Sequence, residues 1–172
     1  MEQTFMKEKK ILPLVLSMSL PMMLSMLVNS LYNIVDSYFV AQISEQAMTA
    51  LSLVYPLQLL ETAIAVGFGI GINAAAAFYL GAGERKNAND VVTSGTLLSI
   101  VHGIVLTLFS IGFARYFVGM FTDQQPILGD AVKYAWIVFA FTIPNVVAIT
   151  FEKIFQAEGR MKVSMISMLC GC

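Results

Sequence analysis

Residues 11–40 read ILPLVLSMSLPMMLSMLVNSLYNIVDSYFV, and Asp36 is the only charged residue in this run. A helix needs about 20 consecutive, mostly apolar residues to cross the hydrocarbon core of a bilayer. The strands of a membrane barrel would instead alternate polar and apolar residues over about ten positions. The run is longer than that and does not alternate, so it predicts a transmembrane helix.

Further apolar runs follow the first one along the chain. They cover residues 47–80, residues 91–120, about residues 127–156, and residues 163–172. The last run would reach only about 15 Å, which is half of a hydrocarbon core. We therefore expect an all-α, polytopic transmembrane helical bundle with four spanning helices plus a truncated fifth. Residues 1–10 would form an N-terminal tail, and residues 11–172 one transmembrane unit.

The composition excludes several other classes of protein. Of the 172 residues, 58% are hydrophobic and 12% are charged, against about 25% charged residues in soluble domains. The mean hydropathy is +0.77, and so short a chain has too little interior to bury this apolar surface. A soluble domain, a disordered chain and a nucleic-acid binder are thus excluded, and the net charge of −1 indicates no strongly charged partner. Cys170 and Cys172 are too close together to staple a fold.

The basic residues predict the orientation in the membrane. Of the ten Lys and Arg residues, all but Arg115 and Lys133 lie before the first run, between the second and third, or at the end of the fourth and beyond. The positive-inside rule places that side, and with it the N-terminal tail, in the cytoplasm. The first run is too long for a cleavable signal peptide. We expect a multi-pass protein of the inner (plasma) membrane.

Polar residues recur at helical spacing in the first run, namely Ser25, Asn29, Tyr32, Asn33 and Asp36. They fall on one face of a helix, which must face protein or a water-filled cavity rather than lipid. A carboxylate beside amide and phenol oxygens suits H⁺ or Na⁺, and an acid inside a membrane segment is a candidate functional residue. The alternative is that Asp36 is a solvated acid near the outer interface. No other metal site is indicated.

Glu61 lies near the middle of the second run, one turn after Gln58. Glu61 could line the same cavity, either as a second proton site or as a contact for a cationic substrate. The alternative is a protonated acid that is hydrogen-bonded to a neighbouring helix. His102, the single histidine, is expected to make an interhelical hydrogen bond.

Prolines and small residues punctuate the runs. Pro21, Pro56 and Pro144 each remove a backbone hydrogen bond and favour a kink. Small residues recur in residues 65–81, where they favour close helix packing. The sequence has no HExxH, GxSxG, Walker A or CxxC motif, so an enzyme is not indicated.

Three segments together resemble the multidrug and toxic compound extrusion (MATE) transporters, most closely the bacterial MepA-like branch. They are residues 12–40 with Pro21 and the YNIVD run at 32–36, residues 50–88 with the glycine-rich helix and its GAG loop, and residues 141–165. The resemblance covers nearly the whole chain after the N-terminal tail. Any one of these features alone would be weak.

The resemblance implies a twelve-helix transporter that exports cationic or amphipathic drugs in exchange for H⁺ or Na⁺ and needs no other cofactor. Asp36 matches the acid assigned to ion coupling in the first helix, and Pro21 matches the proline proposed as a hinge. Tyr32, Asn33 and Asn29 would line the cavity. Glu61 departs from the uncharged residue usual at its position. Family members are much longer, so this chain would be an N-terminal fragment, namely part of the N-terminal lobe.

Two other functions stay open at this stage. One is a small helical membrane protein that does not transport. The other is a flippase for lipid-linked precursors, which belongs to the related superfamily. A flippase cavity for anionic head groups should contain several basic residues within the helices, and here Arg115 and Lys133 both lie near the outer ends.

Overall fold

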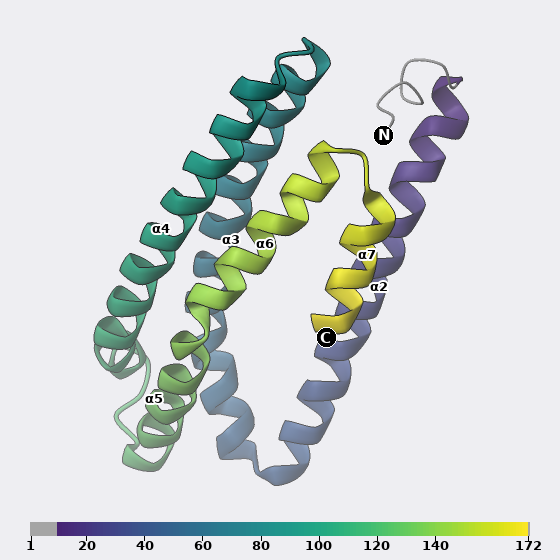
Figure 1. Ribbon diagram of the computed structural model, residues 1–172. Helices are drawn as coiled ribbons and strands as arrows, with labels where there is room; N and C mark the ends of the chain where they lie inside the picture. The colour runs from purple at the N-terminus through teal and green to yellow at the C-terminus, as the bar shows by residue number, and fades with distance from the viewer. Residues whose placement is uncertain (1–9, 172) are drawn as a thin grey trace.

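The computed structural model describes residues 10–171, and within them the chain is helical without any strand. The helices are α2 (Ile11–Ile43), α3 (Glu45–Gly81), α4 (Arg85–Gly119), α5 (Gln125–Ala140), α6 (Thr142–Ala157) and α7 (Met161–Gly171) (Figure 1). The all-α prediction is confirmed. The predicted tail lies outside the described residues except for Lys10, and so does Cys172.

The helices α2, α3 and α4 are each long and apolar enough to cross a membrane, and α5 with α6 adds a fourth span if the bent pair is counted as one. The fourth predicted span differs from expectation, because the chain breaks at Phe141 and the two helices meet at a bend of 47°. Pro144 has no N–H to donate to the Ala140 carbonyl, and its ring disfavours helical backbone there. The helices at Pro21 and Pro56 run on without a break.

Short turns join the long helices. Ser44 caps α3, and its side-chain oxygen accepts a hydrogen bond of 3.0 Å from the Ala47 N–H. Gly83 in the next turn has a φ of 81°, a conformation that favours glycine. The helix α4 starts at Arg85, earlier than the predicted residue 91, and Asn87 donates a hydrogen bond of 2.6 Å to the Glu84 carboxylate.

The helix α3 is the central element, since it packs against α4, α5, α6 and α2. The main apolar core lies where α3, α4 and α5 meet, around Val54, Val118 and Phe139. Burial of Phe139 is complete. The core is thus built at the end of the bundle that includes the loop between α4 and α5.

Polar contacts join the other parts of the bundle. Thr150 Oγ1 of α6 lies 2.9 Å from Ser99 Oγ of α4 in a buried position. Asn73 of α3 donates to the Lys153 carbonyl of α6 over 2.7 Å. Near them Gly69 is buried, and an added Cβ would lie 2.9 Å from Lys153 Cγ, so small residues on this face do permit close packing.

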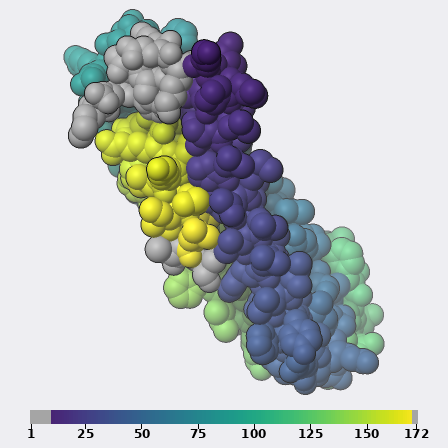
Figure 2. All heavy atoms as spheres, turned by 90° about the vertical axis from the view of Figure 1, so that its right-hand side faces the viewer, coloured from purple at the N-terminus to yellow at the C-terminus, as the bar shows by residue number. Residues whose placement is uncertain are grey.

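The helix α2 stands apart from the others. It meets α3 at the turn around Ser44 and diverges from it, while α7 lies along its other part (Figures 1 and 2). Ser25 is its one buried residue in the described structure, and most of its apolar side chains are exposed. Large exposed apolar surface is typical of a helix that faces lipid or another part of a membrane protein.

Candidate ion-binding site

The polar stripe of α2 is present as a continuous face. Asn33 Nδ2 donates to the Asn29 carbonyl over 2.8 Å and lies 3.1 Å from Asn29 Oδ1. Tyr32, Asn33 and Asp36 are exposed, and Asn29 is half-buried. The structure therefore brings the predicted α2 residues together on one face, of which Tyr32, Asn33 and Asp36 are the exposed part.

The stripe approaches the bundle at Tyr134 of α5. Tyr134 lies within electrostatic reach of Asp36 and Tyr32, and its hydroxyl is a neighbour of the Gln58 side chain on α3. Both Tyr134 and Gln58 are half-buried. Tyr134 thus has polar neighbours on both α2 and α3.

Glu61 lies one turn after Gln58 on α3. Its side chain is only 6% exposed, so it does not lie on the open face of α2. Its polar neighbour is Thr142, the first residue of α6, which is 1% exposed. The Thr142 hydroxyl has no hydrogen-bond partner in the described structure. Glu61 and Asp36 are therefore two separate carboxyl groups, one buried and one open.

Sequence reasoning did not single out Tyr134 or Thr142. Nothing in the local pattern of residues connects them with α3 or α2, because that proximity comes from how α5 and α6 pack. The single available signal was Pro144, which sets the break that places Thr142 at the start of a helix.

Pro21 lies inside α2, half-buried and one turn before Ser25. The Ser25 hydroxyl donates to the Pro21 carbonyl over 2.9 Å. Missing its own N–H, Pro21 weakens the backbone ladder of the helix at this turn. The predicted hinge residue therefore lies where the helix lacks one backbone hydrogen bond.

The interhelical hydrogen bond predicted for His102 is not found among the described residues, because its ring nitrogen meets a carbonyl of its own helix α4. Its ring centroid lies 4.7 Å from that of Phe68 on α3, and Nδ1 lies 3.0 Å from the Leu98 carbonyl. Across residues 10–171, no group of three His, Cys, Asp or Glu side chains could hold a metal ion. The candidate site thus consists of carboxyl, amide and hydroxyl oxygens.

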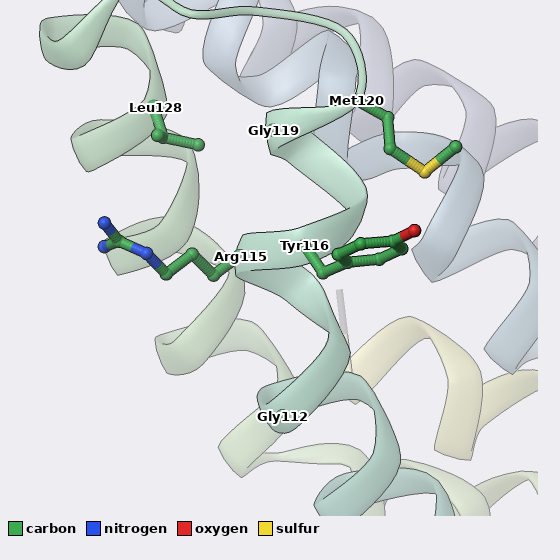
Figure 3. Close-up of a pocket in the computed structure, with 6 residues that line it drawn as sticks. All are labelled: Gly112, Arg115, Tyr116, Gly119, Met120 and Leu128. Carbon is green, nitrogen blue, oxygen red and sulfur yellow. The ribbon is translucent and has the colours of Figure 1, made fainter.

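A separate groove of about 520 Å³ lies on α4, beside the start of α5. It is lined by residues that include Arg115, Tyr116 and Leu128, and Figure 3 shows Arg115 and Tyr116 pointing to opposite sides of α4. None of the predicted site residues lines it. We therefore place the candidate ion site at the α2 stripe and Glu61 rather than in this groove.

The sequence is similar to a known protein family and to several of its members. The sequence profile of the MatE family matches residues 21–172. The multidrug export protein MepA of Staphylococcus haemolyticus (strain JCSC1435) is 26% identical over 170 residues, which are 98% of this chain and 38% of that protein. The chain thus spans well under half the length of this relative.

Solved structures share the fold. A MATE structure in a straight conformation matches with a TM-score of 0.86 and 25% identity, and one in a bent conformation with 0.83 and 26%. Each match covers 91% of this chain and 35% of the other. The helix order, the apolar spans and the profile that spans most of the sequence lead to one conclusion: this chain belongs to the MatE family.

Proposed function

We propose that this protein is part of a multidrug efflux transporter that exports cationic or amphipathic drugs in exchange for H⁺ or Na⁺. The observation that carries the proposal is Asp36, which lies on a polar face of a helix long and apolar enough to cross a membrane. The MatE profile and the similarity to the multidrug export protein MepA support the same function.

The coupling step is assigned to Asp36. Its carboxylate changes charge when it takes up or releases an ion, and Tyr32, Asn33 and Asn29 supply further oxygen atoms along the stripe. If the occupied and empty forms favour different shapes of α2, the ion and the drug become linked through that conformational equilibrium. Pro21 is the proposed hinge, because the backbone ladder is weakest there.

The proposed location is the inner (plasma) membrane, with the N-terminus in the cytoplasm. Transport by a family of this kind uses sites between two halves of the protein near the midplane. We therefore assign these residues to part of the N-terminal lobe, which completes a site together with the other lobe. A flippase for anionic head groups is less well supported, because Arg115 and Lys133 are both exposed on the outer parts of α4 and α5.

The test is drug efflux by the complete protein that carries this sequence, expressed in cells that lack other exporters. Asp36→Asn should lower ion-driven efflux by at least about tenfold, since a lost coupling carboxyl removes the differential binding of the ion. Asp123→Asn, which changes an exposed acid in the loop after α4, is the matched control and should leave efflux unchanged. Equal efflux by Asp36→Asn and wild type under both pH and Na⁺ gradients would falsify the role of Asp36.

A further inference from the structure

Glu61 is a buried carboxyl group for which the described structure offers no counter-ion. The two ion pairs present in it are Lys153–Glu152 and Arg160–Glu158, both on or next to α6. A bare carboxylate in a low-dielectric interior is unfavourable, whereas a carboxyl that holds a proton or a cation is tolerated. Glu61 therefore has the chemistry of an ion-binding group rather than of a structural ion pair.

Thr142 gives an independent indication that this position is built for an ion. Thr142 is 1% exposed, and its buried hydroxyl lacks a hydrogen-bond partner in the described structure and is a neighbour of the Glu61 carboxyl. A protonated Glu61 can donate to Thr142 Oγ1, and a deprotonated Glu61 can accept from the Thr142 hydroxyl. The pair can thus be satisfied with and without the proton, which a reversible proton site requires.

The charge of Glu61 can affect the break between α5 and α6. The Thr142 side chain that neighbours the Glu61 carboxyl belongs to the first residue of α6, and a helix N-terminus favours negative charge. Loss of the proton would strengthen the attraction between α3 and the start of α6. Such a change would alter the 47° bend between α5 and α6.

Protons would reach Glu61 by way of polar groups on α3 and α5. Gln58 lies one turn before it on α3 and is next to the Tyr134 hydroxyl, which lies within electrostatic reach of Asp36 on the exposed stripe. Hydroxyl and amide groups together with water can relay protons along such a path.

The charged and titratable side chains on the helices that pack against α3 have neighbours other than Glu61. The His102 ring contacts that of Phe68 in a tilted arrangement, Lys153 pairs with Glu152, and Asp36 is exposed on α2. These side chains include Tyr32 and Asp36 on α2, His102 and Arg115 on α4, Lys133 and Tyr134 on α5, and Glu152 and Lys153 on α6. Within residues 10–171, the ion pairs and hydrogen bonds join none of them to Glu61.

We propose that Glu61 and Thr142 form a second proton-binding site, buried at the break between α5 and α6 and separate from Asp36. This inference rests on the proposed function, since it assigns a second proton to the same transport cycle. The site gains a proton on one side of the membrane and releases it on the other, so each cycle would exchange two protons rather than one.

The experiment counts protons with the complete protein in proteoliposomes. The drug ratio across the membrane at steady state is measured against an imposed pH gradient, with the membrane potential held at zero. The slope of the logarithm of the ratio against the pH difference gives the protons exchanged per drug molecule. We expect a slope of about two for the wild type and about one for Glu61→Gln. The matched control is Glu45→Gln, which changes an exposed acid on the same helix and should keep the wild-type slope.

Two further variants protect the test against a folding defect. Glu61→Asp keeps a carboxyl group and should restore most of the slope. Thr142→Val removes the hydroxyl with little change of shape and should shift the pH dependence of transport, whereas Thr62→Val on the exposed side of α3 should not. If Glu61→Gln does not fold, an unshifted pH dependence for Thr142→Val overturns the proposal.

The remaining outcomes also separate the two proposals. A wild-type slope in active Glu61→Gln overturns the second proton site, and so does a slope that follows a Na⁺ gradient and disappears with Glu61. If the wild type moves no drug under either gradient, the proposed function itself fails, and the second proton site that rests on it fails with it.

Discussion

Two glycines on α4 differ in their surroundings, since one is in close contact with α3 and the other is open. Adding a methyl group at each of them therefore tests the packing of α4. A Cβ on Gly95 would lie 2.7 Å from Ile72 Cγ1, and Ile72 is buried on α3. A Cβ on Gly112 would meet nothing within 4 Å. The helix backbone is the same at both positions, so the difference between them reports the contact between α3 and α4.

We therefore expect Gly95→Ala to destabilise the protein by about 1–3 kcal/mol, because a branched side chain with buried neighbours has little room to move. Gly112→Ala should be neutral or stabilising by up to about 1 kcal/mol, since alanine favours the helix and the site is open. Thermal unfolding of the detergent-purified protein measures both. Equal midpoints for the two variants would contradict the close approach of α3 and α4 at Gly95.

The individual residues of the candidate site show what the sequence could and could not predict. Asp36, Asn33 and Tyr32 share a helix, so their spacing alone predicted their common face. Thr142 and Tyr134 come from other helices, and their proximity to Glu61 and Gln58 depends on tertiary packing that no local pattern encodes. The sequence could therefore supply the acids of the candidate site but not the side chains that surround the buried one.

At the scale of the element, the break at Phe141 is the feature that composition alone did not predict. Hydropathy predicted one span over residues 127–156, because apolar residues continue through the break. Three prolines remove the same hydrogen bond in three helices, yet the chain breaks at Phe141, three residues before Pro144, and the helices continue through Pro21 and Pro56. The local chemistry is shared, so the outcome must depend on what each helix packs against.

Pro144→Ala should reduce this bend, because residue 144 could then donate to the Ala140 carbonyl and complete the helix. Spin labels at the exposed positions Asp130 and Glu158 would move apart by about 3–4 Å as the 47° bend straightens, given a rise of 1.5 Å per residue. Pulsed electron resonance measures this distance. Pro126→Ala, at the first turn of α5 where proline costs nothing, is the control that should leave it unchanged.

At the scale of the whole molecule, the length of α4 decides how the chain can sit in a bilayer. Its 35 residues are longer than the hydrocarbon core requires, so both ends should reach water on opposite sides. The first turn of α4 contains Asn87, and the loop after α4 contains Asp123, both exposed. The distribution of Lys and Arg places the Asn87 end in the cytoplasm.

This orientation is tested by cysteine labelling of the complete protein, after the native cysteines are replaced by serine. A membrane-impermeant maleimide should react with Asn87→Cys in inside-out vesicles and with Asp123→Cys in intact cells, because each position reaches water on one side alone. Leu108→Cys is the matched control in the middle of α4, where the side chain is exposed to lipid in the bundle and should react from neither side. Labelling of Asn87→Cys in intact cells would reverse the predicted topology, and with it the side of the membrane from which Asp36 and Glu61 receive their protons.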